Sequence, residues 1–270
     1  RVVYAVEDPN PNVNGSGATR LREAGIEVQG GLMRDEAERL NPGFFTRMRH
    51  HRPWVRVKLA QSMDGHVSLA NGSSQWISCA ESRADVQRWR ARSDVILTGI
   101  GTMLADDPSM TVRTDENARQ PTRVVVDSHW RTPDTAKMLG LPGETWICGL
   151  DGDDFNDSLK QRGAKCVFMP ENNNRVDLKV LMAELAQNDF NEIQVEAGAT
   201  LCGELLQQGL IDELLIYQAP ILLGGGAVSP FVSPRLDNMD NRVHLEWIDS
   251  RRIGQDIRLR FKPRVSNPAI

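Results

Sequence analysis

Apolar and polar positions change rhythm repeatedly along the chain, with short apolar runs alternating with longer stretches in which apolar residues recur at helical spacing. After residue 53 the apolar runs predict β-strands at residues 55–60, 95–98, 123–127, 145–148, 166–169, 193–196 and 213–218. The stretches between them predict helices near residues 81–93, 156–162, 177–187 and 200–208. Strands that alternate with helices are typical of an α/β domain built on a mostly parallel sheet.

The last part of the chain breaks this alternation. Two further strand patterns, residues 244–248 and 256–261, follow the last helix with no helix between them. They predict antiparallel strands that close one edge of the sheet. Because exposed strand edges pair readily, the apolar residues 214–217 and 245–248 predict an edge for self-association.

The beginning of the chain has a pattern of its own. It predicts a strand at residues 2–6, a turn-rich loop, a helix around residues 18–24, a strand at residues 27–29 and a charged helix at residues 35–40. A segment of about fifty residues does not readily support a core. We therefore interpret residues 1–50 as the C-terminal end of a domain whose beginning is absent, joined through the polar, basic residues 47–53 to a main domain at residues 51–265, with a tail at residues 266–270. The alternative is that residues 1–50 embellish the main domain.

Composition narrows the function classes. Of 270 residues, 40% are hydrophobic, which is enough for one core with a small annex. The 32 basic and 36 acidic residues give a net charge of −4, and without a basic stripe we expect no nucleic-acid partner. The apolar runs are too short for a membrane span and no signal peptide is recognised, so we expect a cytoplasmic protein with no membrane partner. The cysteines are dispersed, and we expect reduced thiols in the core rather than a metal site: Cys79, Cys148, Cys166 and Cys202.

The most informative candidate chemistry lies in residues 192–206, where a short apolar strand runs through Glu196 and Gly198 into a helix. Gly198 lets a ligand approach the backbone, and the amides of Ala199, Thr200 and Leu201 lie at the positive end of the helix dipole. This junction predicts a phosphate-binding turn. An ordinary strand-glycine-helix turn is the alternative.

A second junction of the same kind lies at residues 94–108. Gly99 and Gly101 end an apolar strand, and Thr102 is expected to cap a short helix that stops before Pro108. Two such turns predict that one dinucleotide spans both. The third glycine and the later acidic residue of a Rossmann fingerprint are missing, which argues against an ordinary Rossmann domain.

Motifs throughout residues 54–262 resemble the reductase domain of the bifunctional riboflavin-biosynthesis deaminase/reductase family. They occur in the family's order at residues 57–67, 72–78, 97–108, 124–128, 195–201 and 219–226. The resemblance implies a dihydrofolate-reductase-like fold, with a mixed, mostly parallel sheet flanked by helices. Residues 3–11 also resemble the last third of the family's deaminase domain, which implies that residues 1–50 are a truncated α/β cytidine-deaminase-like remnant.

The resemblance implies NADPH-dependent reduction of 5-amino-6-(5-phosphoribosylamino)uracil to 5-amino-6-(5-phosphoribitylamino)uracil, by hydride transfer to C1′ of the ribose. Such a reaction needs mainly orientation and phosphate binding, because the cofactor carries the difficult step. The resemblance also implies a homodimer and, for a full-length protein, deamination of the preceding pyrimidine.

A zinc deaminase needs His-x-Glu and Pro-Cys-x-x-Cys. Here His244 and Glu246 match the first pattern by letters alone, with no Cys-x-x-Cys after them. We therefore expect zinc only in the absent part of the deaminase domain and no deaminase activity in this chain.

The resemblance also implies a set of site residues. On the cofactor side it points to Ala60, Trp76, Thr102, Asp106, Ser128 and the turn formed by Gly198, Ala199, Thr200 and Leu201, beside Gly99 and Gly101 of the second turn. On the substrate side it points to Ser74, Arg90, Met110, Arg113 and Glu196, with Glu196 near the transferred hydride. Lys58 points to the same strand face as Ala60 and is a candidate proton donor.

Each assignment has a structural alternative. Arg90 lies in an arginine-rich helix whose charged face is solvated by default, Trp76 can be a core residue, and Asp106 can terminate a helix. Glu196 can be a structural cap. In favour of a site, a convergent pair of Arg90 and Arg113 suits bidentate recognition of a phosphate.

Two other functions remain open. One is an NADPH-dependent pterin or folate reductase of the same fold, for which Glu81 or Asp85 would supply the acid against the pterin ring. The other is a catalytically silent nucleotide-binding module, which cofactor binding without turnover would reveal.

Overall fold

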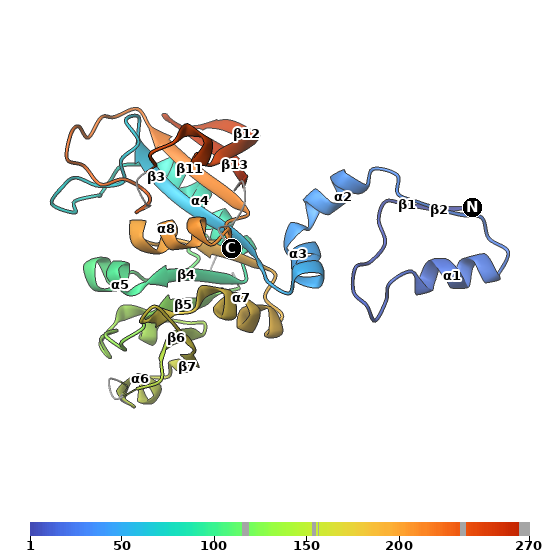
Figure 1. The fold of residues 1–270 in the computed structure, drawn as a ribbon, viewed down its shortest axis with the longest axis horizontal. Helices are drawn as coiled ribbons and strands as arrows, with labels where there is room; N and C mark the ends of the chain where they lie inside the picture. The colour runs from blue at the N-terminus through green and yellow to red at the C-terminus, as the bar shows by residue number, and fades with distance from the viewer. Residues whose placement is uncertain (115–118, 153–154, 156, 233–235, 265–270) are drawn as a thin grey trace. The chain divides into compact units, whose positions relative to one another are not determined.

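The computed structural model describes residues 1–114, 119–152, 155, 157–232 and 236–264 (Figure 1). The chain forms two compact units, one made of Arg1–Trp54 with Met182–Asn191 and the other of Val55–Leu181 with Glu192–Ile270. Among the described residues, no helix is both long enough and apolar enough to cross a membrane.

A sheet of nine strands dominates the described part of the second unit, in the order β12-β13-β11-β3-β10-β4-β5-β6-β7. The strands are β3 (Trp54–Ser62), β4 (Val95–Gly99), β5 (Thr122–Val126), β6 (Thr145–Leu150), β7 (Lys165–Met169), β10 (Glu192–Val195), β11 (Glu213–Ala219), β12 (His244–Ile253) and β13 (Asp256–Arg264). β3 pairs in parallel with β11, as β4 does with β10 and β5, and β6 does with β5 and β7. β13 pairs antiparallel with β11 and β12, which confirms the predicted antiparallel edge.

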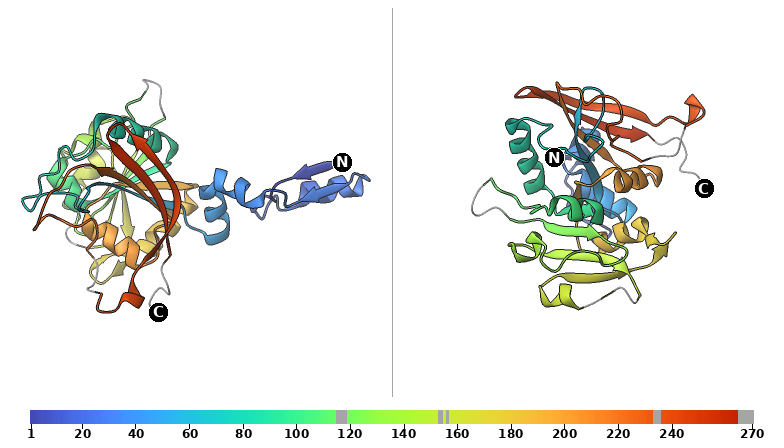
Figure 2. Two further views of the ribbon diagram at one scale, coloured as in Figure 1. Left: turned by 90° about the horizontal axis from the view of Figure 1, so that it is seen from above. Right: turned by 90° about the vertical axis from the view of Figure 1, so that its left-hand side faces the viewer.

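Helices cover both faces of this sheet, α4 lying on one face and α8 on the other (Figure 2). The helices that lie wholly in this unit are α4 (Ala80–Arg92), α5 (Ile100–Asp106), α6 (Ser158–Gln161) and α8 (Ala199–Gln207), while α7 (Leu178–Gln187) is divided between the two units. Short elements outside the sequence predictions are the 3₁₀ turns η1 (Lys137–Gly140) and η2 (Met239–Asn241) and the hairpin of β8 (Glu171–Asn172) and β9 (Arg175–Val176). The layered arrangement confirms the predicted α/β class.

The central strands are apolar on both faces. Leu97, Val124, Val125, Ile147 and Val195 are all inaccessible to solvent. A parallel strand with helices on both sides must bury both of its faces, so it reads as a continuous apolar run rather than an alternating one. This is why the apolar runs predicted these strands to within two residues of their ends.

The same rule corrects the predicted edge. Leu214–Tyr217 lie in β11, between β13 and β3, and Leu215 and Tyr217 are fully buried. The prediction that residues 214–217 form a sheet edge is therefore wrong, because a strand that is apolar on both faces belongs inside a sheet. β12 is the terminal strand of the described sheet, and Leu245, Trp247 and Ile248 on it are exposed.

The first unit contains a parallel pair of short strands, β1 (Val2–Tyr4) and β2 (Val28–Gly30), with α1 (Ser16–Glu23), α2 (Arg34–Leu40) and α3 (Pro42–His50). Helix α3 is a difference from the sequence analysis, which treated residues 47–53 as a linker. Pro42 stands at its first turn, where its missing N–H costs nothing, and Phe45 is buried. Arg47 Nε donates to Asn191 Oδ1 at 2.8 Å, so the basic residues of this segment contribute to packing.

Charged side chains are buried at the amino ends of three neighbouring strands. Arg56, near the start of β3, is fully buried and lies 3.2 Å from Glu192 of β10 and 3.1 Å from Glu213 of β11. Its guanidinium carbon lies 4.4 Å from the ring centroid of Trp89 on α4. Outer arginines complete the pairing, since Arg92 contacts Glu192 at 2.8 Å and Arg260 contacts Glu213 at 2.6 Å. Two carboxylates can remain buried here because several guanidinium groups surround them.

Removing the charge of Arg56 tests whether it stabilises the buried carboxylates of Glu192 and Glu213. We expect Arg56→Ala to lower the free energy of unfolding by about 3–5 kcal/mol, because it leaves two carboxylates buried beside an empty space. The exposed pair of Arg264 and Glu246 is the control, and Arg264→Ala should cost about 0–1 kcal/mol. Urea unfolding of both variants measures the difference, and equal losses would contradict the central role of Arg56.

Candidate functional site

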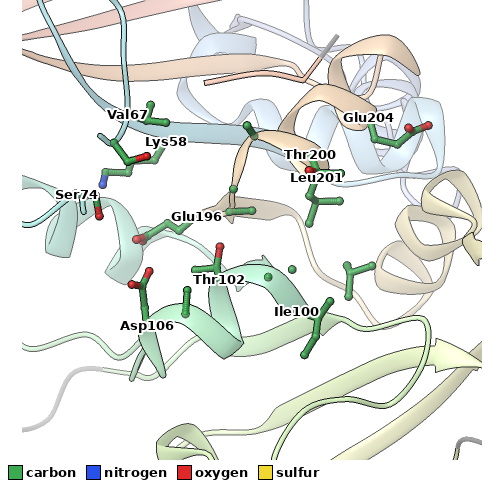
Figure 3. A pocket seen from close by; sticks show the side chains of 18 of the residues that line it. Lys58, Val67, Ser74, Ile100, Thr102, Asp106, Glu196, Thr200, Leu201 and Glu204 are labelled. Carbon is green, nitrogen blue, oxygen red and sulfur yellow. The ribbon is translucent and has the colours of Figure 1, made fainter. Parts of the chain in front are cut away.

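A large cavity of about 1510 Å³ opens at the carboxyl ends of the parallel strands (Figure 3). Lys58 and Ala60 of β3 line it, and so do Gly99 at the end of β4, Val126 at the end of β5 and Glu196 just after β10. Ligand sites of open α/β sheets lie at this end, because the loops that follow parallel strands gather there. Cavities of roughly 300–1,000 Å³ hold a drug-sized ligand, so this one has room for a dinucleotide together with a second molecule.

The two predicted glycine turns pack against each other at the wall of this cavity. Gly198 is the N-cap of α8 and Gly99 the N-cap of α5, and neither has a side-chain cap. A Cβ added to Gly99 would lie 3.3 Å from Leu201 Cδ2, and one added to Gly198 would lie 3.7 Å from Thr102 Oγ1. The turns therefore approach closely, and the uncapped amides at the start of α8 are available to an anion.

Helix α5 differs from expectation in one respect. It begins at Ile100, directly after Gly99, so Thr102 lies inside its first turn and is not the cap. Because α5 has only seven residues, its dipole is weak compared with that of a longer helix. Thr102 contributes a hydroxyl to the cavity wall instead (Figure 3).

At one end of the cavity, Glu196 and Arg90 form a closed ion pair. Arg90 Nε donates to Glu196 Oε1 at 2.7 Å and Nη2 donates to Oε2 at 2.8 Å, while Nη1 donates to the Thr111 carbonyl at 2.9 Å. Gln194 Nε2 donates to Glu196 Oε1 at 2.7 Å. Only 11% of the Arg90 side chain and 13% of the Glu196 side chain are exposed. The guanidinium thus holds the carboxylate in place, and its expected role as a phosphate ligand stays a prediction.

Burial and neighbouring charges have opposite effects on the pKa of Glu196. Burial raises the pKa of Glu196, but the charge and hydrogen bonds of Arg90, the charge of Lys58 and the hydrogen bond from Gln194 outweigh it and lower the pKa to about 2. Burial lowers the pKa of Lys58, Glu196 opposes this shift and Arg90 adds to it. Near neutral pH the carboxylate is ionised, while the ammonium gives up its proton more readily than an exposed lysine.

The other predicted residues fall into two groups. Most line the cavity, and Figure 3 shows Lys58, Ser74 and Glu196 directed into the same part of it. The predicted residues that line the cavity are Lys58, Ala60, Ser74, Trp76, Arg90, Gly99, Gly101, Thr102, Asp106, Arg113, Ser128, Glu196, Gly198, Ala199, Thr200 and Leu201. Trp76 is 69% exposed, with the guanidinium carbon of Arg83 4.5 Å from its ring centroid, so it is not a core residue.

Met110 is the exception. Its side chain is buried in an apolar cluster with Met103, Trp130 and Ile147, and it does not line the cavity. The expected substrate contact of Met110 stays a prediction.

Several lining residues escaped the sequence analysis. Arg83 on α4, the turn residues His129 and Arg131, and the hairpin residues Asn172–Arg175 all line the cavity. The turn could have been found, since it follows a predicted strand at its carboxyl end. The short strands β8 and β9 carry no apolar periodicity, and so no pattern indicated them.

Comparison with known proteins agrees with this geometry. A family model described as the RibD C-terminal domain matches residues 53–259. The chain belongs to the RibD family. Riboflavin biosynthesis protein RibD of Escherichia coli (strain K12) is 42% identical over 95% of this chain and 72% of that protein. The counterpart in Haemophilus influenzae is 38% identical over 98% of this chain and 73% of that protein.

Solved structures give the same result. RibD of Acinetobacter baumannii, form 1, superposes with a TM-score of 0.88 at 39% identity, covering 97% of this chain and 72% of that one. Riboflavin biosynthesis reductase Rib7 of the yeast Saccharomyces cerevisia shares the fold, with a TM-score of 0.63 at 23% identity over 79% of this chain and 91% of that one. The predicted family and the dihydrofolate-reductase-like fold are both confirmed.

The pairing of Arg90 with Glu196 predicts how stability responds to acid. A carboxyl group whose pKa is lowered from 4.5 to about 2 contributes stability that is present above pH 4.5 and is lost as the pH falls through about 2. Without Arg90 the pKa of Glu196 rises, so Arg90→Met should show a smaller gain in unfolding free energy between about pH 3 and about pH 5 than the unsubstituted chain.

The double variant Arg90→Met/Glu196→Gln is the control for this measurement. It lacks the ionising group, so its stability should contain no contribution from Glu196 at either pH. If Arg90→Met and the unsubstituted chain gain the same stability over this interval in urea unfolding, Arg90 does not set the pKa of Glu196.

Proposed function

We propose that this chain catalyses the NADPH-dependent reduction of 5-amino-6-(5-phosphoribosylamino)uracil to 5-amino-6-(5-phosphoribitylamino)uracil. As a member of the RibD family it is an enzyme of riboflavin biosynthesis with pyrimidine reductase function. A reductase of this kind uses a nicotinamide cofactor, and the choice of NADPH is part of the proposal. The observation that carries the proposal is the ion-paired Glu196, with Lys58 beside it, directly before the uncapped turn at Gly198 in one cavity.

The residues present fit a dinucleotide. Gly198 has no Cβ to block the approach of a phosphate, and the amides at the start of α8 have no side-chain cap that competes for them. Gly99 stands where a Cβ would press against Leu201, so the glycine allows the two turns to pack together. Trp76 and Ala60 line the cavity on the β3 side, where a flat ring system can lie against them.

The cofactor, when bound, supplies the hydride that reaches C1′ of the opened ribose. The chain itself orients the substrate: Ser74 and Arg113 bind its polar groups and its phosphate, and Arg90 keeps the Glu196 carboxylate fixed toward the ribose. The reaction also consumes one proton, which goes to the ribose ring oxygen as the C1′–O bond opens. Lys58 is the proton donor in this proposal, because its ammonium lies in the cavity and burial lowers its pKa.

Turnover is the direct test. The unsubstituted chain should oxidise NADPH when the phosphorylated pyrimidine is added and zinc is omitted. We expect Arg113→Ala to raise the KM for this substrate by about 10–100-fold, because a charge-assisted contact to the phosphate is lost. The dephosphorylated substrate is the control, since its weaker turnover should not change in the variant. Tight cofactor binding with no oxidation would instead favour a catalytically silent module.

Lys58 has a separate prediction. Lys58→Met should lower kcat by about 100–10,000-fold while leaving the Kd for NADP⁺ nearly unchanged, because a proton donor acts on the chemical step. The rate of the unsubstituted enzyme should fall as the pH rises through the lowered pKa of Lys58, because the protonated form is the active one. Lys179→Met, an exposed substitution outside the cavity, is the matched control. A Lys58 variant with normal kcat would assign the proton to solvent or substrate.

A pterin or folate reductase would need Glu81 or Asp85 as an acid in the cavity, and neither residue lines it. Asp85 is buried and accepts hydrogen bonds from the Tyr217 hydroxyl at 2.7 Å and from Arg258 at 3.0 Å, and it does not line the cavity. Glu81 does not line it either. Neither carboxylate lines the cavity, so no observation favours a folate-type site.

Three further proposals rest on the family. A homodimer is proposed, with the exposed apolar residues Leu245, Trp247 and Ile248 of β12 as an available edge.

Deamination of the preceding pyrimidine is proposed for a full-length protein, with zinc bound outside this chain. Among the described residues, no cluster of three or more potential ligands could hold a metal ion. A cytoplasmic location stays a prediction.

A further inference from the structure

Residues 110–113 form neither a helix nor a strand, but their side chains alternate as those of a strand do. Met110 and Val112 are buried, whereas Arg113 is exposed and lines the cavity. A backbone outside a helix or a sheet must find other hydrogen-bond partners. The groups that bond this segment therefore determine where Arg113 is held.

The side chain of Gln120 takes the place of a neighbouring strand at Val112. The Val112 N–H donates to Gln120 Oε1 at 2.9 Å, and Gln120 Nε2 donates to the Val112 carbonyl at 3.0 Å. A residue in an antiparallel pair exchanges the same two hydrogen bonds with the residue opposite it. Met110 adds an apolar anchor, since it packs in the same buried cluster as Trp130. The two inward-facing residues of the segment are thus fixed from the core side.

Helix α4 holds the other two residues of the segment from the cavity side. Arg90 Nη1 donates to the Thr111 carbonyl at 2.9 Å, and the Arg113 N–H donates to Gln87 Oε1 at 3.0 Å. Gln87 and Arg90 are three positions apart in α4, so they lie on one face of it, and both line the cavity. Two neighbouring side chains of one helix therefore bind the segment on either side of Val112.

Arg90 also connects this segment to the reaction end of the cavity. Its Nε and Nη2 groups donate to Glu196 while its Nη1 group donates to Thr111, so one guanidinium contacts both. The backbone of Arg113 itself is held by Gln87. Glu196, which we propose to face the ribose, and Arg113, which we propose to bind the phosphate, are thus spaced by side chains of the same helix.

We propose that Gln87 is a positioning residue for Arg113, and that its side-chain carbonyl holds the Arg113 backbone where the guanidinium reaches the substrate phosphate. This inference rests on the proposed function. An arginine loses much conformational freedom when it is fixed against a ligand, and a backbone that is already held leaves less freedom to lose. Because only molecules in the binding-competent conformation bind the ligand, releasing the backbone lowers the apparent affinity by the fraction that remains competent. Gln87 needs no contact with the substrate in this role.

Steady-state kinetics of Gln87→Met tests this role, because methionine has a similar length but no side-chain oxygen to accept from the Arg113 N–H. We expect the KM for 5-amino-6-(5-phosphoribosylamino)uracil to rise about 3–10-fold, with kcat within about 2-fold of that of the unsubstituted chain. The rise is smaller than for Arg113→Ala because the guanidinium is still present. With the dephosphorylated substrate, Gln87→Met should leave KM and kcat unchanged. Gln120→Met, which releases Val112, should raise the KM for the phosphorylated substrate in the same way.

A double variant separates positioning from general damage. If Gln87 acts through Arg113, Gln87→Met/Arg113→Ala should have the same KM as Arg113→Ala alone, because the arginine to be positioned is gone. A contribution of Gln87 that is independent of Arg113 would instead multiply the two increases in KM. Gln161→Met, an exposed substitution on α6 outside the cavity, is the matched control and should leave the kinetics unchanged.

The outcomes also distinguish the positioning role from the proposed function. If the unsubstituted chain reduces the phosphorylated pyrimidine but Gln87→Met keeps its KM, loses kcat, or raises the KM for the dephosphorylated substrate equally, the positioning role is wrong and the proposed function stands. The same holds if the two increases multiply in the double variant. If the unsubstituted chain does not reduce the pyrimidine, both proposals are wrong. A rise in KM that is confined to the phosphorylated substrate and absent without Arg113 supports the role of Gln87.

Discussion

Two ion pairs fix helix α4 against strand β10, and the site depends on them. Arg92 contacts Glu192 at the amino end of the strand, and Arg90 contacts Glu196 just past its carboxyl end. The helix and the strand must therefore run in opposite directions, because the arginine later in the helix meets the acid earlier in the strand. A shift of α4 that broke the Arg90–Glu196 pair would leave the mostly buried Glu196 carboxylate without this cation, whereas Glu192 would still contact Arg56. The carboxylate in the cavity is thereby placed by the same contacts that hold the sheet to its covering helix.

This arrangement resolves a conflict between burial and charge. A carboxylate enclosed by protein tends to become protonated, and an enclosed lysine tends to lose its proton. Arg90 reverses the first tendency and adds to the second, so Glu196 remains an anion while the pKa of Lys58 is lowered. Two groups on neighbouring strands thus receive opposite roles from one cation. The result is a fixed negative charge beside a reactive proton, which suits a reaction that adds both a hydride and a proton.

The sequence predicted what depends on local pattern and missed what depends on contacts between distant residues. Apolar runs located the buried strands, and glycines after strands located the turns at Gly99 and Gly198, because these features are written in a few adjacent residues. The position of Leu214–Tyr217 inside the sheet depends on which strands pair with β11, and that information is spread over the chain. The partner of Arg90, Glu196, is 106 residues away along the chain. The sequence of the helix alone therefore indicated a positive charge but not the carboxylate with which it pairs. The apolar neighbours of Met110 likewise come from several elements, so no local pattern indicated its burial.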